Sequence, residues 1–347
     1  MKYSRIIKYS VAVAVLLSVA SCDHKELCFD HPEHALRYDT DVKISYNREW
    51  ELPYKNQTDW QAEWNEAEFG MSYNSLLPQE PSGVRVAMYA QEPPRLVDNI
   101  GAHGGTIRMR PGLNSVIFYN NDTEYIVFDD MDNFASAKAT TRSRSRSTYQ
   151  GNPFASDYGS RAETTVAPPD MLYAYYVDDY LQNKVEEPQK MNVLMQPLVF
   201  TYLVRYEFDA GMEYVGIARG ALSGMAESVS LSSGRTSKEP ATILFDCELK
   251  PWGVEAIVCS FGVPDFPNDL YSRAGNEYGL NLEVRLRNGK MFSFDFDISS
   301  QIEKQPHGGV ITVGGLSISD EDGWEGGSGF DVSVDGWGEW EDIDIEL

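Results

Sequence analysis

The chain has 347 residues, of which 42% are hydrophobic and 24% are charged, and its formal net charge is −24. A surface this acidic repels the phosphates of nucleic acids and anionic lipids, so nucleic-acid binding is excluded as a function class. A chain of this length is expected to form two domains of ordinary size.

Residues 1–22 are typical of a bacterial lipoprotein signal peptide. Lys2, Arg5 and Lys8 precede the ten-residue apolar run 11–20, which suits a signal sequence and is shorter than the about 20 residues that span a membrane. Small residues precede Cys22, which predicts removal of residues 1–21 and lipidation of Cys22 with acyl chains such as palmitate. Each buried CH₂ contributes about 0.8 kcal/mol, so several chains would hold the protein stably in the outer membrane.

Residues 22–40 are expected to form a tether. The acidic residues Asp23 and Glu26 resemble the export signal of Bacteroidetes surface lipoproteins, which favours display on the cell surface. Cys28, His31 and His34 have a spacing found in zinc sites, but a polar linker explains them better, and we assign no metal or other cofactor.

Alternation of apolar and polar residues predicts β-strands along most of the mature chain. The first predicted strand places Val42, Ile44 and Tyr46 on one face, and a second places Val84, Val86 and Met88 on one face. Residues 114–120 and 124–130 are predicted to pair as a hairpin across a turn at 120–122.

Residues 132–168 are rich in Ser, Thr, Ala and Arg, and they predict a mobile surface loop. Arg142, Arg144 and Arg146 are expected to be exposed there, with tryptic-type cleavage as an alternative role. The polar run that ends near residue 190 favours a domain boundary at about 195.

Strands are also predicted in the second half of the chain, at 196–208, 212–218, 241–248, 254–261, 309–313, 330–334 and 341–347. The clearest pattern is 282–298, where two alternating segments flank Asn288 and Gly289, a pair that predicts a type I′ hairpin turn. The acidic, Gly-rich segment 320–329 lacks the ligand spacing of a calcium loop.

Cys247 and Cys259 lie symmetrically about Gly253, so a hairpin centred there would bring them face to face. A disulfide is consistent with the oxidising compartment, and two free buried thiols are the alternative. The redox state of Cys28 is likewise left open.

Trp50, Trp60 and Trp64 suggest two alternatives, a buried cap on a β-sandwich or an exposed platform for sugar rings, of which we favour the buried cap. The sequence lacks the nucleophile-elbow, zincin, Walker and dinucleotide motifs, so we expect no enzymatic activity.

Three segments resemble fimbrillin-like lipoproteins of Bacteroidetes, in particular the DUF5119 family within the fimbrillin and fimbrial-anchor superfamily. They are CDHKELCFDHP at 22–32, MEYVGIARGALSGMAESVSLSSG at 212–234 and GFDVSVDGWGEWEDIDIEL at 329–347. This resemblance implies an all-β fold with two tandem transthyretin-like β-sandwich domains, here assigned to 41–195 and 196–347. It also implies a stalk, anchor or tip role in surface fimbriae or adhesion.

In polymerising members of that superfamily, a protease cuts after Arg or Lys and removes an N-terminal strand, and a neighbouring subunit then donates a strand to the groove. Arg37 and Arg48 bracket the first predicted strand and are the candidate cleavage sites. The alternating run Ile343, Ile345 and Leu347 either completes its own sheet or is lent to a neighbour.

The sequence therefore favours a non-enzymatic surface lipoprotein that contacts fimbrial subunits or a host or bacterial surface ligand through strands and surfaces. The alternative is a glycan-binding surface lipoprotein of a polysaccharide-uptake system.

Overall fold

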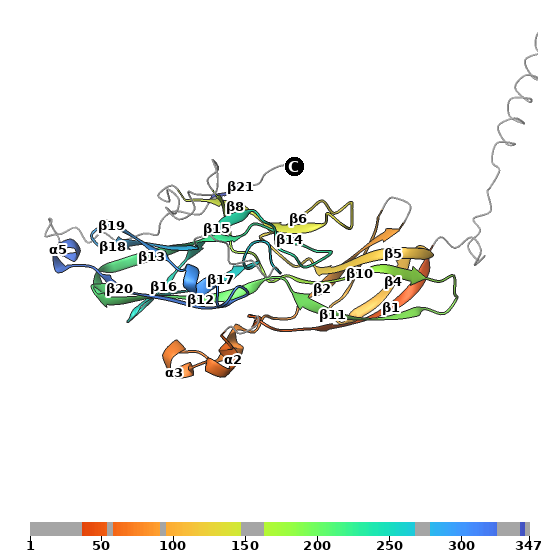
Figure 1. Ribbon diagram of the computed structural model, residues 1–347, viewed down its shortest axis with the longest axis horizontal. Helices are drawn as coiled ribbons and strands as arrows, with labels where there is room; N and C mark the ends of the chain where they lie inside the picture. The colour runs from red at the N-terminus through yellow and green to blue at the C-terminus, as the bar shows by residue number, and fades with distance from the viewer. Residues whose placement is uncertain are drawn as a thin grey trace, which may run out of the picture.

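The computed structural model describes residues 37–53, 58–90, 95–146, 163–267, 278–324 and 341–343. Strands dominate these residues and gather into two groups along the long axis of the molecule, as Figure 1 shows. The described helices are single turns, and none of them is long and apolar enough to cross a membrane. The prediction of a mainly β protein is confirmed.

The first group is one sheet that closes on itself in the order β1-β11-β10-β5-β2-β3-β4, here called the closed sheet. Its strands are β1 (Tyr38–Tyr46), β2 (Gly83–Ala90), β3 (Leu96–Gly101), β4 (Gly104–Met109), β5 (Gly112–Asn120), β10 (Tyr173–Gln182) and β11 (Gln189–Pro197). Alternate residues of these strands fill its interior, including the predicted inward faces of β1 and β2. The alternation rule therefore placed the core residues of both strands correctly.

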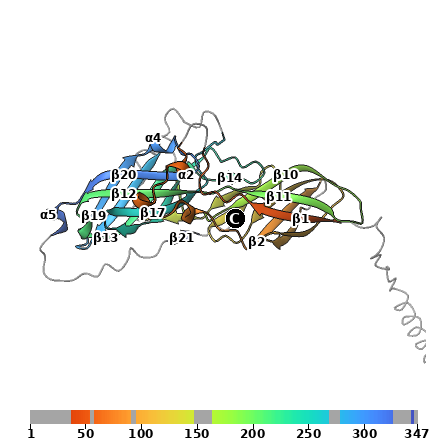
Figure 2. The ribbon, with the colours of Figure 1, turned by 90° about the horizontal axis from the view of Figure 1, so that it is seen from below.

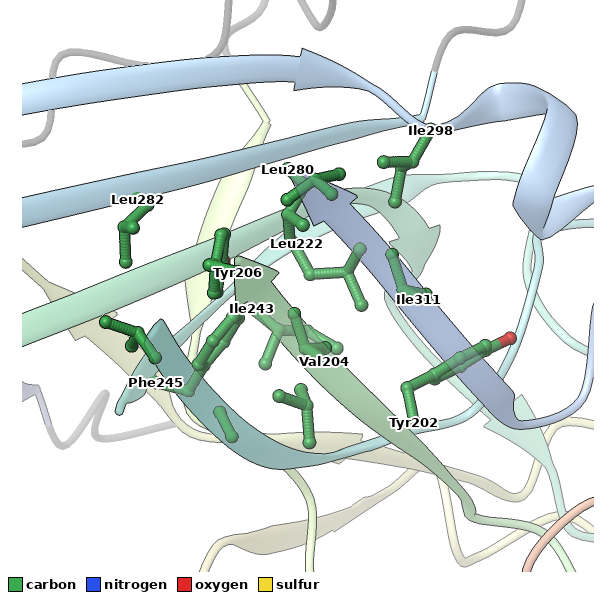
Figure 3. Close-up of a cluster of buried hydrophobic side chains, with 14 of the residues drawn as sticks. Tyr202, Val204, Tyr206, Leu222, Ile243, Phe245, Leu280, Leu282, Ile298 and Ile311 are labelled. Atoms are coloured by element: carbon green, nitrogen blue, oxygen red, sulfur yellow. The ribbon is translucent and has the colours of Figure 1, made fainter. Parts of the chain in front are cut away.

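The second group contains two sheets packed face to face. The long sheet has the order β19-β18-β13-β15-β9-β8-β21, and the short sheet has the order β16-β17-β12-β20. Their strands are β8 (Ser143–Ser145), β9 (Thr164–Val166), β12 (Phe200–Ala210), β13 (Val215–Ala226), β15 (Pro240–Asp246), β16 (Glu248–Lys250), β17 (Gly253–Ser260), β18 (Gly279–Leu286), β19 (Met291–Asp297), β20 (Gly309–Ser317) and β21 (Glu341–Ile343). Figure 3 shows Leu222, Ile243 and Leu280 of the long sheet meeting Val204 and Ile311 of the short sheet.

A small third sheet, β14-β7-β6, lies between the two groups; its strands are β6 (Ile126–Asp129), β7 (Lys138–Thr141) and β14 (Val229–Ser230). The predicted hairpin of 114–120 with 124–130 is wrong, because β5 pairs with β2 and β10 while β6 pairs with β7. Strand β5 is buried on both faces: Val116 and Phe118 face the closed sheet's interior, whereas Ile117 and Tyr119 pack against the small sheet.

The hairpin predicted at 282–298 is confirmed as β18 and β19, but its turn differs from the prediction. The Gly289 N–H donates to the Leu286 carbonyl, and only Gly289 of the loop has a positive φ, +89°. The turn is therefore a three-residue loop with glycine in the left-handed position, whereas type I′ would also require a positive φ at Asn288.

The segment rich in Ser, Thr and Arg contributes strands β7, β8 and β9 within its described residues, so the prediction of a loop is wrong there. Arg144 and Arg146 are buried, at 8% and 6% exposure. Arg146 lies 3.5 Å from the Glu283 carboxylate and donates to the Asn281 side chain at 3.1 Å. These polar partners on the long sheet hold the Arg146 side chain, which follows β8, against that sheet.

A helical insertion between β1 and β2 covers the outside of the short sheet; it comprises α2 (Trp60–Glu63), α3 (Glu66–Phe69) and the 3₁₀ turn η2 (Tyr73–Leu76). Phe69 packs against Leu203 and Val310 of that sheet, with Trp60 and Trp64 beside them. Figure 2 shows α2 over the strands of the second group, so this insertion ties a segment near the N-terminus to the C-terminal half. The remaining described turns are η4 (Met212–Tyr214), α4 (Ser299–Ile302) and α5 (Asp320–Gly323).

Candidate functional site

The candidate site is strand β1 together with the two strands that hold it. Residues Thr40 to Tyr46 run parallel to β11, and residues Tyr38 to Lys43 run antiparallel to β4. Both backbone edges of β1 are therefore used along most of its length. Without β1, the facing edges of β4 and β11 would present unpaired N–H and C=O groups to an incoming strand.

The side chains of β1 alternate between the interior and solvent. Thr40, Val42 and Ile44 are 0%, 6% and 4% exposed, whereas Asp41 and Lys43 are exposed. Burying a Val or Ile side chain stabilises a protein by about 1.5–3 kcal/mol. β1 is therefore an integral part of the core as well as of the sheet.

Gly104 lets the backbones of β1 and β4 approach closely. A Cβ at this position would lie 2.0 Å from the Val42 carbonyl oxygen, and the φ of Gly104 is +123°. Any other residue would push the two strands apart, so glycine here keeps the groove that holds β1 narrow.

Two side-chain hydrogen bonds, one buried and one partly buried, fasten β1 near its ends. The Thr40 hydroxyl donates to the Gln182 side-chain oxygen at 2.6 Å, and the Tyr46 hydroxyl donates to the Ala102 carbonyl at 2.6 Å. Burial, with a contribution from the Glu80 carboxylate, raises the pKa of Tyr46 to about 12. Tyr46 therefore stays a neutral hydrogen-bond donor at physiological pH.

The two predicted cleavage residues flank β1 and are both exposed. Arg37 immediately precedes the strand, and the Arg48 Nε donates to the Pro78 carbonyl at 2.8 Å. Trp50, two residues further on, is fully buried. A cut after Arg48 would thus separate β1 from a firmly packed downstream segment, whereas a cut after Arg37 would leave β1 attached.

Several predicted features lie outside the described residues. They are the signal sequence 1–21, the lipidation site Cys22, most of the tether 22–40 with Cys28 and its histidines, the predicted strand 330–334 and the last four residues of the chain. Within the described part, no three His, Cys, Asp or Glu side chains are grouped so as to hold a metal ion.

Cys247 and Cys259 are both free in the structure. A short hairpin of β16 and β17 forms there, but its register pairs Glu248 with Glu255 instead of centring on Gly253. The preceding strand β15 belongs to the long sheet, so the two cysteines do not meet. Cys247 packs against the core between those sheets, whereas Cys259 pairs with Thr201 and packs beside the small sheet. Burial raises the pKa of both thiols, so both stay protonated.

The three tryptophans near residue 60 form a packed aromatic cluster. Trp50 is fully buried, with its ring 5.6 Å from that of Trp64, and Tyr73 lies 5.1 Å from Trp50. The Trp60 and Trp64 indoles are half-buried and donate to Gln305 and Met71. The favoured interpretation as a buried cap is confirmed for Trp50, whereas Trp60 and Trp64 are only partly covered.

Two titratable groups, the buried Glu51 and the partly buried His307, were not identified in the sequence analysis. Glu51 is 3% exposed, and burial raises its pKa to about 7. The His307 ring stacks on Phe200 at 4.2 Å and meets Phe266 edge-on, and burial lowers its pKa to about 3. Both lie in stretches without hydrophobic periodicity, so no local signal marks them as buried.

Relatives of the chain come from Bacteroidetes. A Bacteroides ovatus protein provisionally named fimbrium anchoring subunit Fim4B is 24% identical over 255 residues, which cover 73% of this chain and 64% of that protein. The chain therefore spans less than two thirds of the length of that curated relative.

Among solved structures, a provisionally assigned adhesin from Bacteroides ovatus ATCC 8483 aligns with a TM-score of 0.56 and 19% identity, covering 84% of this chain and 96% of that one. The two proteins therefore share a fold. The fimbrial anchor protein Mfa2 from Porphyromonas gingivalis aligns more weakly, with a TM-score of 0.42 and 10% identity over 80% of this chain and 91% of that one.

The family model described as "Domain of unknown function (DUF5119)" matches residues 71–246, more than half of the chain. This match runs from the helical insertion through the small sheet into β15. The chain belongs to the DUF5119 family.

Proposed function

We propose that this chain is a non-enzymatic, lipid-anchored surface protein of a fimbrial system, and that it anchors fimbriae through strand and surface contacts. The similarity to a fimbrium anchoring subunit and to the fold of an adhesin supports this role. The observation that carries it is the full integration of β1 between β4 and β11.

The order of residues links that observation to anchoring. Cys22, the proposed lipid attachment site, precedes both Arg37 and Arg48. A cut after either arginine would therefore detach the folded protein from its lipid. An anchor must keep β1 in place, and the paired edges, buried side chains and two hydrogen bonds of β1 favour an uncut strand.

We also propose that the two groups of strands correspond to two tandem transthyretin-like sandwich domains that divide near residue 195. Three connections cross this position: β8 and β9 join the long sheet, β14 joins the small sheet, and the helical insertion packs on the short sheet. Such crossing strands would couple the domains mechanically, as a subunit that bears tension requires.

Mass spectrometry of the native protein tests the processing step. We expect a lipid-modified Cys22 in a polypeptide that continues through Arg48. A new N-terminus at Tyr38 or Glu49 would instead identify a subunit that polymerises after cleavage, and would contradict the anchor role.

Genetics tests the anchoring step. Cells that carry Cys22→Ala in place of the native chain should release their fimbriae into the medium, as measured by immunoblotting of the medium for the major fimbrial subunit. Arg287→Gln serves as the matched control, because this arginine is exposed and directly follows β18, which belongs to a different sheet from β1. Fimbriae that remain on Cys22→Ala cells would refute the proposal.

A further inference from the structure

A cleft of about 420 Å³ opens beside the closed sheet, where β2 ends and β5 begins. Its remaining walls come from Arg95 just before β3, from the loop after β6 and from β10. The volume lies within the range of small-ligand sites, about 300–1,000 Å³. The cleft is separate from β1 and from the aromatic cluster, so neither feature accounts for it.

A β-bulge aims part of β10 at this cleft. The register between β10 and β5 shifts between Val177 and Tyr180, and Asp179 in the bulge has a φ of +59°. The neighbouring Asp178 accepts a hydrogen bond from the Ser115 hydroxyl, which fixes the bulge against β5. Bulges re-aim side chains at functional sites, and here the bulge brings Asp179 into the cleft wall.

The lining combines aromatic side chains with hydrogen-bonding groups. Tyr89 and Phe134 meet edge to face at 5.8 Å. Asp132 and Arg95 form an ion pair at 3.4 Å, with the aspartate side chain fully exposed. The cleft therefore offers an aromatic surface beside carboxylate acceptors and guanidinium donors.

Asn114 adds a buried acceptor that lacks a donor. Its amide nitrogen donates to the Arg110 carbonyl at 2.9 Å and to the Gly112 carbonyl at 3.0 Å, which fixes the orientation of the side chain. The residue is 2% exposed, and among the described residues nothing donates to its side-chain oxygen. A buried acceptor without a partner costs free energy, and Asn114 carries this cost in the wall of the cleft.

The charges select the class of ligand. Asp132 already pairs with Arg95, and Asp179 adds negative charge, so an anionic ligand is disfavoured. Hydroxyl groups both donate and accept, which suits carboxylate, amide and guanidinium partners together, and the C–H face of a sugar ring packs on aromatic rings. We propose that this cleft binds a neutral sugar residue of a surface glycan. This site is independent of strand exchange and of the lipid anchor.

Affinity electrophoresis of the mature chain tests the proposal with four neutral polysaccharides (dextran, laminarin, yeast mannan and xyloglucan) and with anionic polygalacturonate. We expect at least one neutral polysaccharide to retard the protein, and polygalacturonate not to. Asp179→Gly and Asp132→Ala should each weaken that retention about tenfold. Both should leave the fold intact, because glycine accommodates the φ of Asp179 and the Asp132 side chain is exposed.

Asp209→Ala is the matched control, since Asp209 is an exposed aspartate on β12, outside the cleft. Thermal unfolding of each variant checks that the fold persists. The proposal is overturned if no neutral polysaccharide retards the protein, if the two cleft variants bind as the wild type does, or if Asp209→Ala weakens binding equally. These outcomes leave the fimbrial release assay unaffected, so the two proposals fail separately.

Discussion

Glu51 links the stability of the protein to pH through its burial just downstream of β1. Its side chain is 3% exposed and accepts a hydrogen bond from the Tyr73 hydroxyl at 2.9 Å. Removal of the carboxylate from water raises its pKa from 4.5 to about 7, although the Tyr73 hydrogen bond opposes this change. Below about pH 7, the folded protein therefore favours the protonated form of Glu51.

Between pH 4.5 and 7, the folded protein keeps a proton on Glu51 that the unfolded chain has lost. This contribution to stability is complete below pH 4.5 and is lost as the pH rises through 7. At about 1.4 kcal/mol per pH unit, the change in pKa corresponds to at most about 3 kcal/mol. Partial solvent screening reduces this figure to between about 1 and 3 kcal/mol.

Urea denaturation of the wild type and Glu51→Gln at pH 4.5 and pH 8 measures this effect. Glutamine keeps an acceptor for Tyr73 but has no charge. The stability of Glu51→Gln relative to the wild type should rise by about 1–3 kcal/mol from pH 4.5 to pH 8. Glu187→Gln, at an exposed position, should show no such change. An equal difference at both pH values would refute the argument from burial.

Three further predictions follow from other buried groups. In urea denaturation, Glu283→Gln should lower the free energy of unfolding by about 3 kcal/mol, because Arg146 loses its charged partner. The double variant Arg146→Met, Glu283→Leu should recover most of this loss, because no charge is then left buried without a partner. Ile44→Ala should lower the free energy of unfolding by about 2–5 kcal/mol. Because a less firmly packed β1 exposes the chain beside it, trypsin should also cut faster after Arg48, as measured by mass spectrometry. Because His307 is protonated only in the unfolded chain between pH 6.5 and about 3, the free energy of unfolding should fall as the pH falls through this range, by up to about 1.4 kcal/mol per pH unit. In thermal unfolding, His307→Gln should flatten this slope. Unchanged stability in Glu283→Gln, unchanged cleavage in Ile44→Ala or an unchanged slope in His307→Gln would contradict the respective argument.

Most strands of this protein can be predicted from the sequence, because alternation and turn residues, which determine them, are local. Alternation at Val42 and Ile44 assigns the inward face of β1, and the segments around Gly289 form a hairpin because a short turn joins adjacent strands. The exposure of Arg37 and Arg48 also follows from their positions beside a strand end. Each of these features depends on residues that are close in the chain.

Which strands pair with each other could not be predicted from the sequence in the same way. β1 pairs with β11, which lies about 150 residues further along the chain. β5 pairs with β2 and β10, and not with β6, the next strand in the sequence. Nothing in the sequence of a strand specifies which distant edge it will meet, because backbone hydrogen bonds are the same for every sequence. The candidate glycan cleft likewise depends on five separate segments meeting, and a bulge at Asp179 completes it.

The sequence by itself determined that this protein consists mainly of strands, which residues of β1 and β18 face a core, and that Arg37 and Arg48 flank the first strand, since periodicity and turn chemistry act over a few residues. Only the tertiary structure decided that Arg146 is buried, that Cys247 and Cys259 belong to different sheets, and that β1 has neighbours on both edges. A charge or a thiol is buried when distant groups compensate it, and those groups come together only in the folded chain.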